Sequence, residues 1–176
     1  MTLQTIEGDS TFVKELLTDG KCDIAFLRSE SSSVKEFNSI PYMIDYLTAV
    51  LPATHPLANA DNLPFEQLRG ETFLLFPEHS FINDLCIREC RNAGFEPHIA
   101  YTGNRGATLI DLVRNGAGIT LMMHHSARQE NDSSLAFIPV TPGIYSYISL
   151  NYAKEKPLSP QAESFVRYVK AHKRDF

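Results

Sequence analysis

The sequence lacks several features that would assign it quickly to a functional class. It has no excess of basic residues, because 16 lysines and arginines face 21 aspartates and glutamates, for a net charge of -5. Nucleic-acid binding needs clustered lysine and arginine against phosphates, so this balance argues against the chain binding nucleic acid by itself. No apolar run approaches the roughly 20 residues of a membrane helix. The first thirty residues carry charges from Glu7 to Asp19 and no long apolar core, so we expect neither a signal peptide nor contact with a membrane.

Cysteine is also scarce. Three cysteines, an odd number in a chain without a visible export signal, predict reduced thiols and a cytoplasmic protein. Cys86 and Cys90 are spaced to share one helix face and could supply two metal ligands, but no second pair lies nearby in the sequence to complete a set. We therefore expect these two residues, like Cys22, to pack in a core, and we expect no metal and no cofactor.

Common catalytic motifs are absent as well: there is no G-x-S-x-G, Walker loop, H-E-x-x-H or G-x-G-x-x-G. "GNRGAT" has two glycines at the wrong spacing for a nucleotide loop. His55 in "VLPATHPLAN" follows an apolar run, and His124 and His125 follow "GITLMM", at the strand end where doubly wound sheets bind ligands. No acidic partner stands in a recognisable pattern beside these histidines. The sequence therefore predicts no enzyme.

What the sequence contains is a regular alternation of strand and helix patterns. Its opening favours a β-α-β unit with a parallel strand pair. In the last helix, Ser159 is placed to cap the N-terminus, and Ala162, Phe165, Val166 and Val169 are spaced to form one buried face. Strands are expected at 3–8, 22–27, 38–52, 72–76, 98–102, 118–123, 135–140 and 145–152, and helices at 9–20, 63–70, 81–95, 106–116 and 159–172.

Three of these helices begin soon after a strand, and their first residues are polar. Free backbone N–H groups at such helix starts suit small carboxylates or phosphates. The same serines and threonines can also act as plain helix caps. Three such starts in one small α/β chain favour a ligand-binding site. The starts are Asp9–Thr11, His79–Phe81 and the segment from Thr102 to Thr108.

The order of five segments resembles the effector-binding domain of LysR-type transcriptional regulators. The segments are "EGDSTFVKELLTDGKCDIAFL", "VLPATHPLAN", "FEQLRGETFLLF", "ECRNAGFEPHIAY" and "TLIDLVRNGAGITLMM". The resemblance implies an α/β, two-lobe fold like that of type 2 periplasmic binding proteins, with two crossing strands and a ligand cleft between the lobes. Lobe I is expected at 1–46 plus 148–176 and lobe II at 47–147. We expect "DIAFL" and "GITLMM" in separate sheets.

The resemblance also implies where the sequence departs from the family. The winged helix-turn-helix that contacts DNA is not present in this chain. A first strand and helix of lobe I would lie before Met1, so lobe I is expected to be incomplete, with an open sheet edge that favours a homo-oligomer. In the family pattern, "HPLA" belongs to a surface loop of lobe II, which assigns His55 a local packing or capping role.

The function implied is sensing of a small-molecule effector, which we expect to be a small organic anion. Ser10, at the family's cleft-facing position after "EG", is expected on one side together with Thr11. The opposing wall is expected from the segments 76–81 and 102–105. Two alternatives stay open: a solute-binding protein of a transport system, which would need an export signal, and a small α/β enzyme. The expected ligand-binding residues are Ser10, Thr11, Phe76, His79, Ser80, Phe81, Thr102, Asn104 and Arg105.

Overall fold

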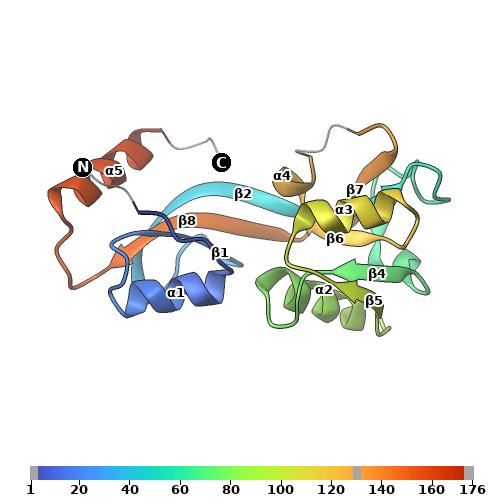
Figure 1. Cartoon of the computed structure of the whole chain (residues 1–176), viewed down its shortest axis with the longest axis horizontal. Helices are drawn as coiled ribbons and strands as arrows, with labels where there is room; N and C mark the ends of the chain where they lie inside the picture. The colour runs from blue at the N-terminus through green and yellow to red at the C-terminus, as the bar shows by residue number, and fades with distance from the viewer. Residues whose placement is uncertain (1–3, 129–131, 173–176) are drawn as a thin grey trace. The chain divides into compact units, whose positions relative to one another are not determined.

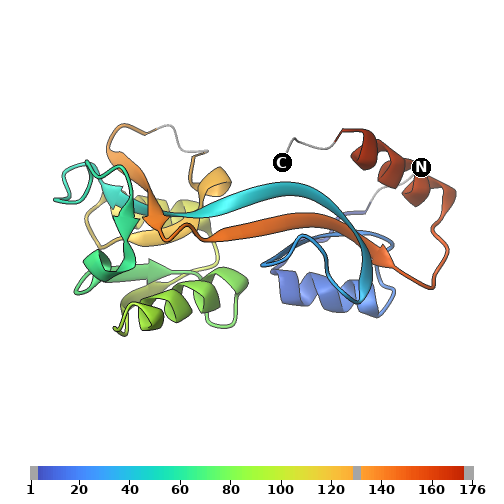
Figure 2. The ribbon, with the colours of Figure 1, turned by 180° about the vertical axis from the view of Figure 1, so that it is seen from behind.

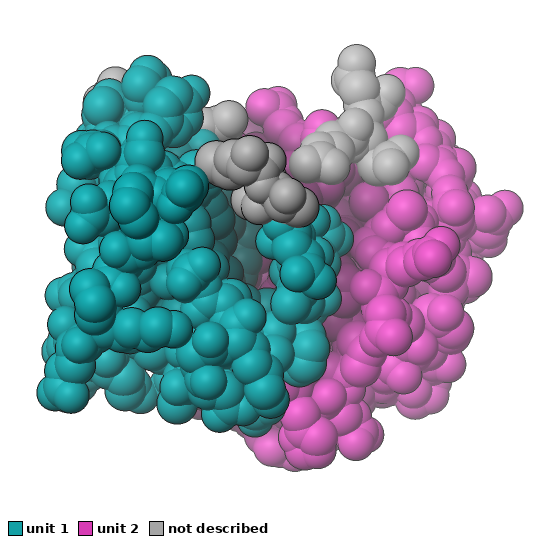
Figure 3. All heavy atoms as spheres, turned by 60° about the vertical axis from the view of Figure 1, so that its left-hand side comes forward, with its two compact units in different colours: residues 1–44, 146–176 teal, residues 45–145 magenta. Residues whose placement is uncertain are grey.

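The structure is a computed structural model that describes residues 4–128 and 132–172. The chain divides into two compact units (Figure 3): unit 1 contains residues 1–44 and 146–176, and unit 2 contains residues 45–145. The division falls inside one long strand, β2, and after the first residue of another, β8, so the chain passes twice from one unit to the other. Among the described residues, no helix is long and apolar enough to cross a membrane.

The elements alternate along the chain as the sequence patterns predict (Figure 1). The helices are α1 (Ser10–Thr18), the 3-10 helix η1 (Phe65–Leu68), α2 (Phe81–Asn92), α3 (Gly106–Arg114), α4 (His124–Ala127) and α5 (Pro160–Ala171). The strands are β1 (Ala25–Ser29), β2 (Phe37–Pro52), β3 (Leu63–Pro64), β4 (Thr72–Leu75), β5 (His98–Thr102), β6 (Thr120–Met123), β7 (Leu135–Thr141) and β8 (Tyr145–Ala153).

Unit 2 is a sheet covered by helices on both faces, with α3 above and α2 below the strands in Figure 1. Side chains alternate along a strand, so a strand buried on both faces must be apolar at every position. β6 is buried at all four positions, and three of its residues are apolar, with Thr120 as the polar exception. Its Leu121 and Met123 pack in one core cluster with Leu85 of α2, and its Met122 packs in a second cluster with Leu109 of α3.

Parallel pairing sets the direction of the strands that lead to the helix starts of unit 2. β4 pairs with β5 in parallel, and Phe73 of β4 forms a parallel bridge with Ile119, just before β6. Gly118 allows this close approach: it has a φ of +154°, and a Cβ there would lie 2.4 Å from the carbonyl oxygen of Thr72. Because these strands run the same way, their carboxyl ends lie at one edge of the sheet.

In unit 1, α1 and α5 pack in separate core clusters. Leu17 of α1 packs with Leu27 of β1, whereas Val166 of α5 packs with Leu150 of β8. Ser159 caps α5 as predicted, by accepting from the N–H of Ala162.

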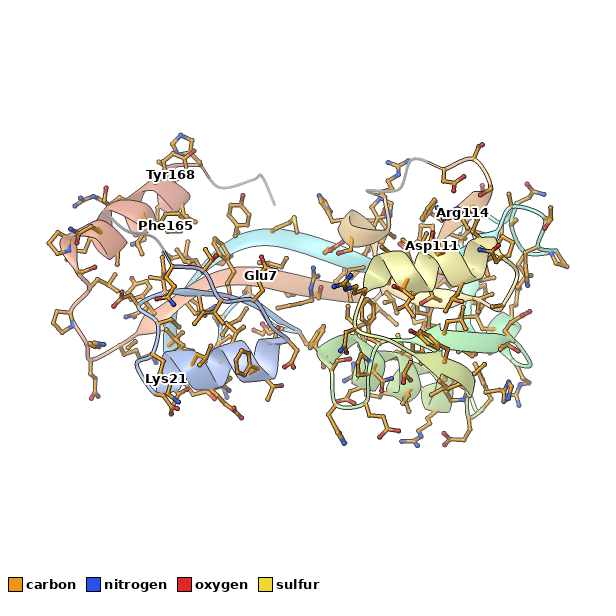
Figure 4. All side chains as sticks on the ribbon, in the orientation of Figure 1. Glu7, Lys21, Asp111, Arg114, Phe165 and Tyr168 are labelled. Atoms are coloured by element: carbon orange, nitrogen blue, oxygen red, sulfur yellow. The ribbon has the colours of Figure 1, made fainter. Side chains whose placement is uncertain are left out.

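Three expectations for unit 1 are wrong or only partly met. Phe165 was expected on the buried face of α5 but is 40% exposed, because it lies at the margin of the stripe that Ala162, Val166 and Val169 form (Figure 4). Residues 4–8, the described part of the first expected strand, form no strand, and β1 instead pairs antiparallel with β8. Alternating apolar residues define two faces of an extended segment but do not supply the neighbouring strand that a sheet requires. The predicted opening β-α-β unit is therefore not formed.

The expectation of separate sheets is also wrong. The strands follow the order β1-β8-β2-β7-β3, with β6 paired to β2, so one hydrogen-bonded path joins β1 to β6. The path exists because β2 and β8 are long and lie side by side (Figure 2). β2 uses Leu47–Val50 to pair with β6, whereas β8 pairs with β1 through residues 147–151.

Candidate functional site

The start of α2 is a turn held by its own side chains. Ser80 caps the helix: its Oγ accepts from the N–H of Asn83 at 3.4 Å and donates to the carbonyl oxygen of Pro77 at 2.7 Å. His79, just before the cap, has a φ of 65°, which is uncommon outside glycine. In the described part of the chain, the backbone N–H groups of Phe81 and Ile82 have no acceptor. These two donors are therefore available to a ligand.

The start of α3 has even less capping. Arg105 occupies the N-cap position, but its side chain makes no capping hydrogen bond. The N–H groups of Gly106 and Ala107 have no acceptor among residues 4–128 and 132–172. The loop before the helix is tied to β4, because the N–H of Gly103 donates to the carbonyl oxygen of Leu75 at 3.0 Å. Arg105 itself is exposed, as are Thr102 and Asn104 in the same loop.

The two helix starts lie beyond the carboxyl ends of neighbouring parallel strands. β4 leads to α2 and β5 leads to α3, so both positive helix ends are at the same edge of the β4–β5 sheet. Phe76 and Phe81 turn their rings toward the core, where they pack against separate apolar clusters. What this edge offers a ligand is therefore mainly backbone N–H groups, together with the exposed guanidinium of Arg105. Such an arrangement favours a small anion.

The start of α1, in unit 1, differs from the expectation that Ser10 either binds ligand or caps the helix. Asp9 is the N-cap, and its Oδ1 accepts from the N–H groups of Thr11 and Phe12 at 2.8 and 3.1 Å. The aspartate wins this position because an ionised carboxylate is the stronger acceptor at a positive helix end. The Thr11 N–H is thus already occupied, and the carboxylate of Asp9 adds a negative charge beside any anion.

The hydroxyl of Ser10 has another role. Its Oγ accepts from the backbone N–H of Arg28 at 3.1 Å, and the guanidinium of Arg28 donates to Ser146 Oγ at 2.6 Å. A serine hydroxyl still has one hydrogen to donate after accepting a bond. Ser10 and Arg28 therefore form a polar pair in unit 1. The expectation that one ligand contacts both Ser10 or Thr11 and the helix starts of unit 2 stays a prediction.

A cluster around Asp45 provides the acidic partner that the sequence did not show beside His124 and His125. Asp45 is fully buried, and its Oδ1 accepts from the backbone N–H of His125 at 3.1 Å. The ring of His124 stacks on Tyr46, with centroids 4.3 Å apart, and its Nδ1 lies 3.3 Å from Thr48 Oγ1. Burial, helped by the positive charge of Arg128, lowers the pKa of His124. The lowered pKa favours the neutral form of the His124 ring, and this ring packs against Tyr46.

Cys86 and Cys90 lie in the core as predicted, whereas Cys22 is partly buried at the edge of a core cluster. Cys86 and Cys90 are fully buried, and burial raises the pKa of both thiols, to about 12 for Cys90. Burial also raises the pKa of Cys22. Reactive cysteines are accessible and have a lowered pKa, so none of these thiols is suited to redox sensing. No group of three histidine, cysteine, aspartate or glutamate residues within the described ranges could hold a metal ion.

His55 contacts its own loop and one acidic residue farther along the chain. Its Nδ1 accepts from the N–H of Leu57 at 3.2 Å, and its Nε2 lies 3.3 Å from Glu71 Oε2. The predicted capping role of His55 is confirmed.

Two polar residues of this region were missed by the sequence analysis. Asp45 bonds the backbone of α4 at His125, and Asn83, which is 1% exposed, donates from Nδ2 to the carbonyl oxygen of Phe76 at 2.8 Å. Each had a signal in the sequence: a single charge inside the apolar strand "IPYMIDYLTAV", and an asparagine one turn before the buried Cys86 and Leu85. A polar residue placed in an apolar face needs partners, and those partners lie at the sheet edge described above.

Comparisons with known proteins agree with this architecture. The family model described as the LysR substrate binding domain matches residues 1–174. The transcriptional dual regulator GltC of Bacillus subtilis (strain 168) is 25% identical over 164 residues, which cover 93% of this chain and 55% of GltC. The hydrogen peroxide-inducible genes activator of Pectobacterium carotovorum subsp. carotovorum is 25% identical over 158 residues, which cover 89% of this chain and 52% of the activator. The chain thus spans about half the length of these relatives.

Solved structures show the same fold. The regulatory domain of CcmR from Synechocystis PCC6803, in complex with 2-PG, has a TM-score of 0.85 at 16% identity, over 96% of this chain and 81% of that domain. The reduced form of OxyR has a TM-score of 0.74 at 23% identity, over 94% of this chain and 78% of that chain. Because the family model matches residues 1–174 of this chain, the chain belongs to the LysR substrate-binding domain family, which comprises the effector-binding domains of LysR-type transcriptional regulators.

Proposed function

We propose that unit 2 binds a small organic anion as its effector, through the starts of α2 and α3. The observation that supports this proposal is a set of four backbone N–H groups, two from each helix, that have no acceptor among the described residues and lie at one edge of the β4–β5 sheet. Helix starts present N–H groups and a partial positive charge together, so they stabilise a carboxylate without a lysine. Arg105, exposed at the start of α3, adds a full positive charge.

The residues expected from the sequence fall into two groups on this proposal. His79, Ser80 and Phe81 belong to the turn and first residue of α2, whereas Thr102, Asn104 and Arg105 belong to the loop before α3. Ser10, next to Arg28 in unit 1, is proposed as an additional hydroxyl donor. We further propose that unit 1 and unit 2 correspond to lobes I and II of the fold.

The role in the whole protein is a further part of the proposal. We propose that effector binding controls DNA binding by a winged helix-turn-helix domain outside this chain, in a cytoplasmic homo-oligomeric regulator that performs no catalysis. A ligand changes such an equilibrium only by binding two states of the protein with different affinity. The family match favours this role over that of a transport solute-binding protein.

The proposal is tested by calorimetric titration of the chain with small mono- and dicarboxylic acids, at low and at moderate salt. We expect saturable binding, and a several-fold loss of affinity in Arg105→Gln that becomes smaller as salt rises. Arg167→Gln is the matched control, because Arg167 is also exposed but lies on α5 of unit 1. If both variants lose affinity equally, the attraction comes from net charge and the proposed site is wrong.

A further inference from the structure

The side chain of Asn83 satisfies only half of its hydrogen-bonding capacity. Asn83 is 1% exposed, and its Nδ2 donates to the carbonyl oxygen of Phe76 at 2.8 Å. The other amide atom, Oδ1, is buried and has no partner among the residues that the structure describes. Rotating the amide by 180° does not help, because Oδ1 would then face the Phe76 carbonyl oxygen, another acceptor. The site therefore lacks a donor for Oδ1.

This unpartnered acceptor lies in the same helical turn as two unpartnered donors. Ser80 caps α2, the N–H groups of Phe81 and Ile82 come next without acceptors, and Asn83 follows them. The N–H groups favour a ligand atom with negative charge, whereas Oδ1 favours a hydrogen-bond donor. Buried polar groups in proteins are nearly always paired, so an orphan at a ligand-binding turn indicates a missing partner.

We infer that the first turn of α2 recognises a carboxylate whose neighbouring carbon carries a hydroxyl or ammonium group, that is, a 2-hydroxy or 2-amino acid. The carboxylate accepts from the N–H groups of Phe81 and Ile82, and the adjacent group donates to Asn83 Oδ1. Oδ1 is shielded from solvent, so the side chain has to shift for any donor to reach it, and a hydroxyl or ammonium group, about the size of a water molecule, requires the smallest shift. This inference rests on the proposed function and narrows it from small organic anions to one chemical class. A site built to pair with a hydroxyl discriminates against the analogue that lacks it, because its own polar group then stays unpaired.

Matched pairs of probes test the inference: acetate with glycolate, propionate with lactate, and succinate with malate. In calorimetric titrations of the full chain, we expect the hydroxylated member of at least one pair to bind about tenfold more tightly. In Asn83→Leu, which keeps a side chain of similar size without the acceptor, this ratio falls to about one, whether or not the affinity for both acids also changes. Asn92→Leu is the control, because Asn92 ends the same helix and is exposed.

The possible outcomes separate this inference from the proposed function. If plain and hydroxylated acids bind the wild-type chain equally, the inference is wrong and the proposed function stands. If no acid of any pair binds, both fail. A preference for the hydroxylated acid that persists in Asn83→Leu also overturns the inference. Should Asn83→Leu not fold, a crystal structure of the wild-type chain with the tightest probe decides. If that structure shows an ordered water donating to Asn83 Oδ1 and the ligand hydroxyl bound elsewhere, Asn83 has only a structural role and the inference is wrong.

Discussion

Replacing Ala107 with proline removes one of the four proposed anion donors and little else. Ala107 is the second residue of α3, is exposed, and its N–H has no acceptor in the described structure. Proline is tolerated in the first turn of a helix, where its missing N–H breaks no intrahelical bond. The preceding residue is Gly106, which has no Cβ to clash with the proline ring. We therefore expect the folding stability of the unliganded chain to change by less than about 1 kcal/mol.

The effect on binding follows from the number and charge of the donors. A hydrogen bond to a charged group contributes roughly 1.5–3 kcal/mol, so the loss of one N–H lowers the affinity for a carboxylate by about ten- to a hundredfold. At an acid concentration of 100 times the wild-type dissociation constant, binding adds about 2.7 kcal/mol to the stability of the wild-type chain. A tenfold weaker variant gains only about half as much.

The assay is thermal unfolding with and without the acid, for the wild-type chain, Ala107→Pro and Ala107→Ser. The serine variant is the matched control, because it retains the N–H and adds only a small polar side chain at the same exposed position. We expect the ligand-induced rise in melting temperature to be about halved in Ala107→Pro and unchanged in Ala107→Ser. An equal rise in all three proteins would refute the role of the α3 start in binding.

Two further predictions concern the core and the pH dependence. Phe73 is fully buried between α2 and the sheet, so Phe73→Ala should lower the free energy of unfolding by about 3–5 kcal/mol. Phe165 is 40% exposed, so Phe165→Ala should lower it by less than about 1 kcal/mol. Unfolding in denaturant measures both losses, and equal losses would contradict the assigned core. The pKa of His124 is lowered in the folded chain, so its neutral form contributes stability that is full above its ordinary pKa of 6.5 and is lost as the pH falls below that value. His124→Phe, which keeps a ring against Tyr46, should therefore show a smaller fall in melting temperature between pH 7.5 and pH 5.5, and an unchanged fall would assign the pH dependence to other groups.

Much of the fold could be predicted because apolar periodicity reports directly on burial. The four buried residues of β6 and the alternating sides of β4 follow from side-chain geometry alone. The failures occurred where a partner distant in the sequence decides the outcome. Residues 4–8 have the pattern of a strand and form none, and Phe165 has the spacing of a core residue and is exposed. Neither result can be read from local spacing, because each depends on which element lies alongside.

The candidate site shows the same division. The sequence identified the polar starts of α1, α2 and α3, because serine and threonine after a strand are local signals. It did not show that Asp9 would occupy the donors of α1, whereas α3 would begin without a side-chain cap. Asp45 and His125 are 80 positions apart, so their hydrogen bond becomes visible only in the folded chain. Local chemistry was thus predictable, and the competition between acceptors was not.

The most direct test of the account follows the backbone amides by NMR during titration with a small carboxylic acid. We predict saturable shifts of the N–H signals of Phe81, Ile82, Gly106 and Ala107, all with the same dissociation constant, because these groups have no acceptor before the ligand binds. The N–H signal of Ala162, already bonded to Ser159 at the start of α5, serves as the internal reference. Saturable shifts confined to residues away from the starts of α2 and α3 would contradict the account.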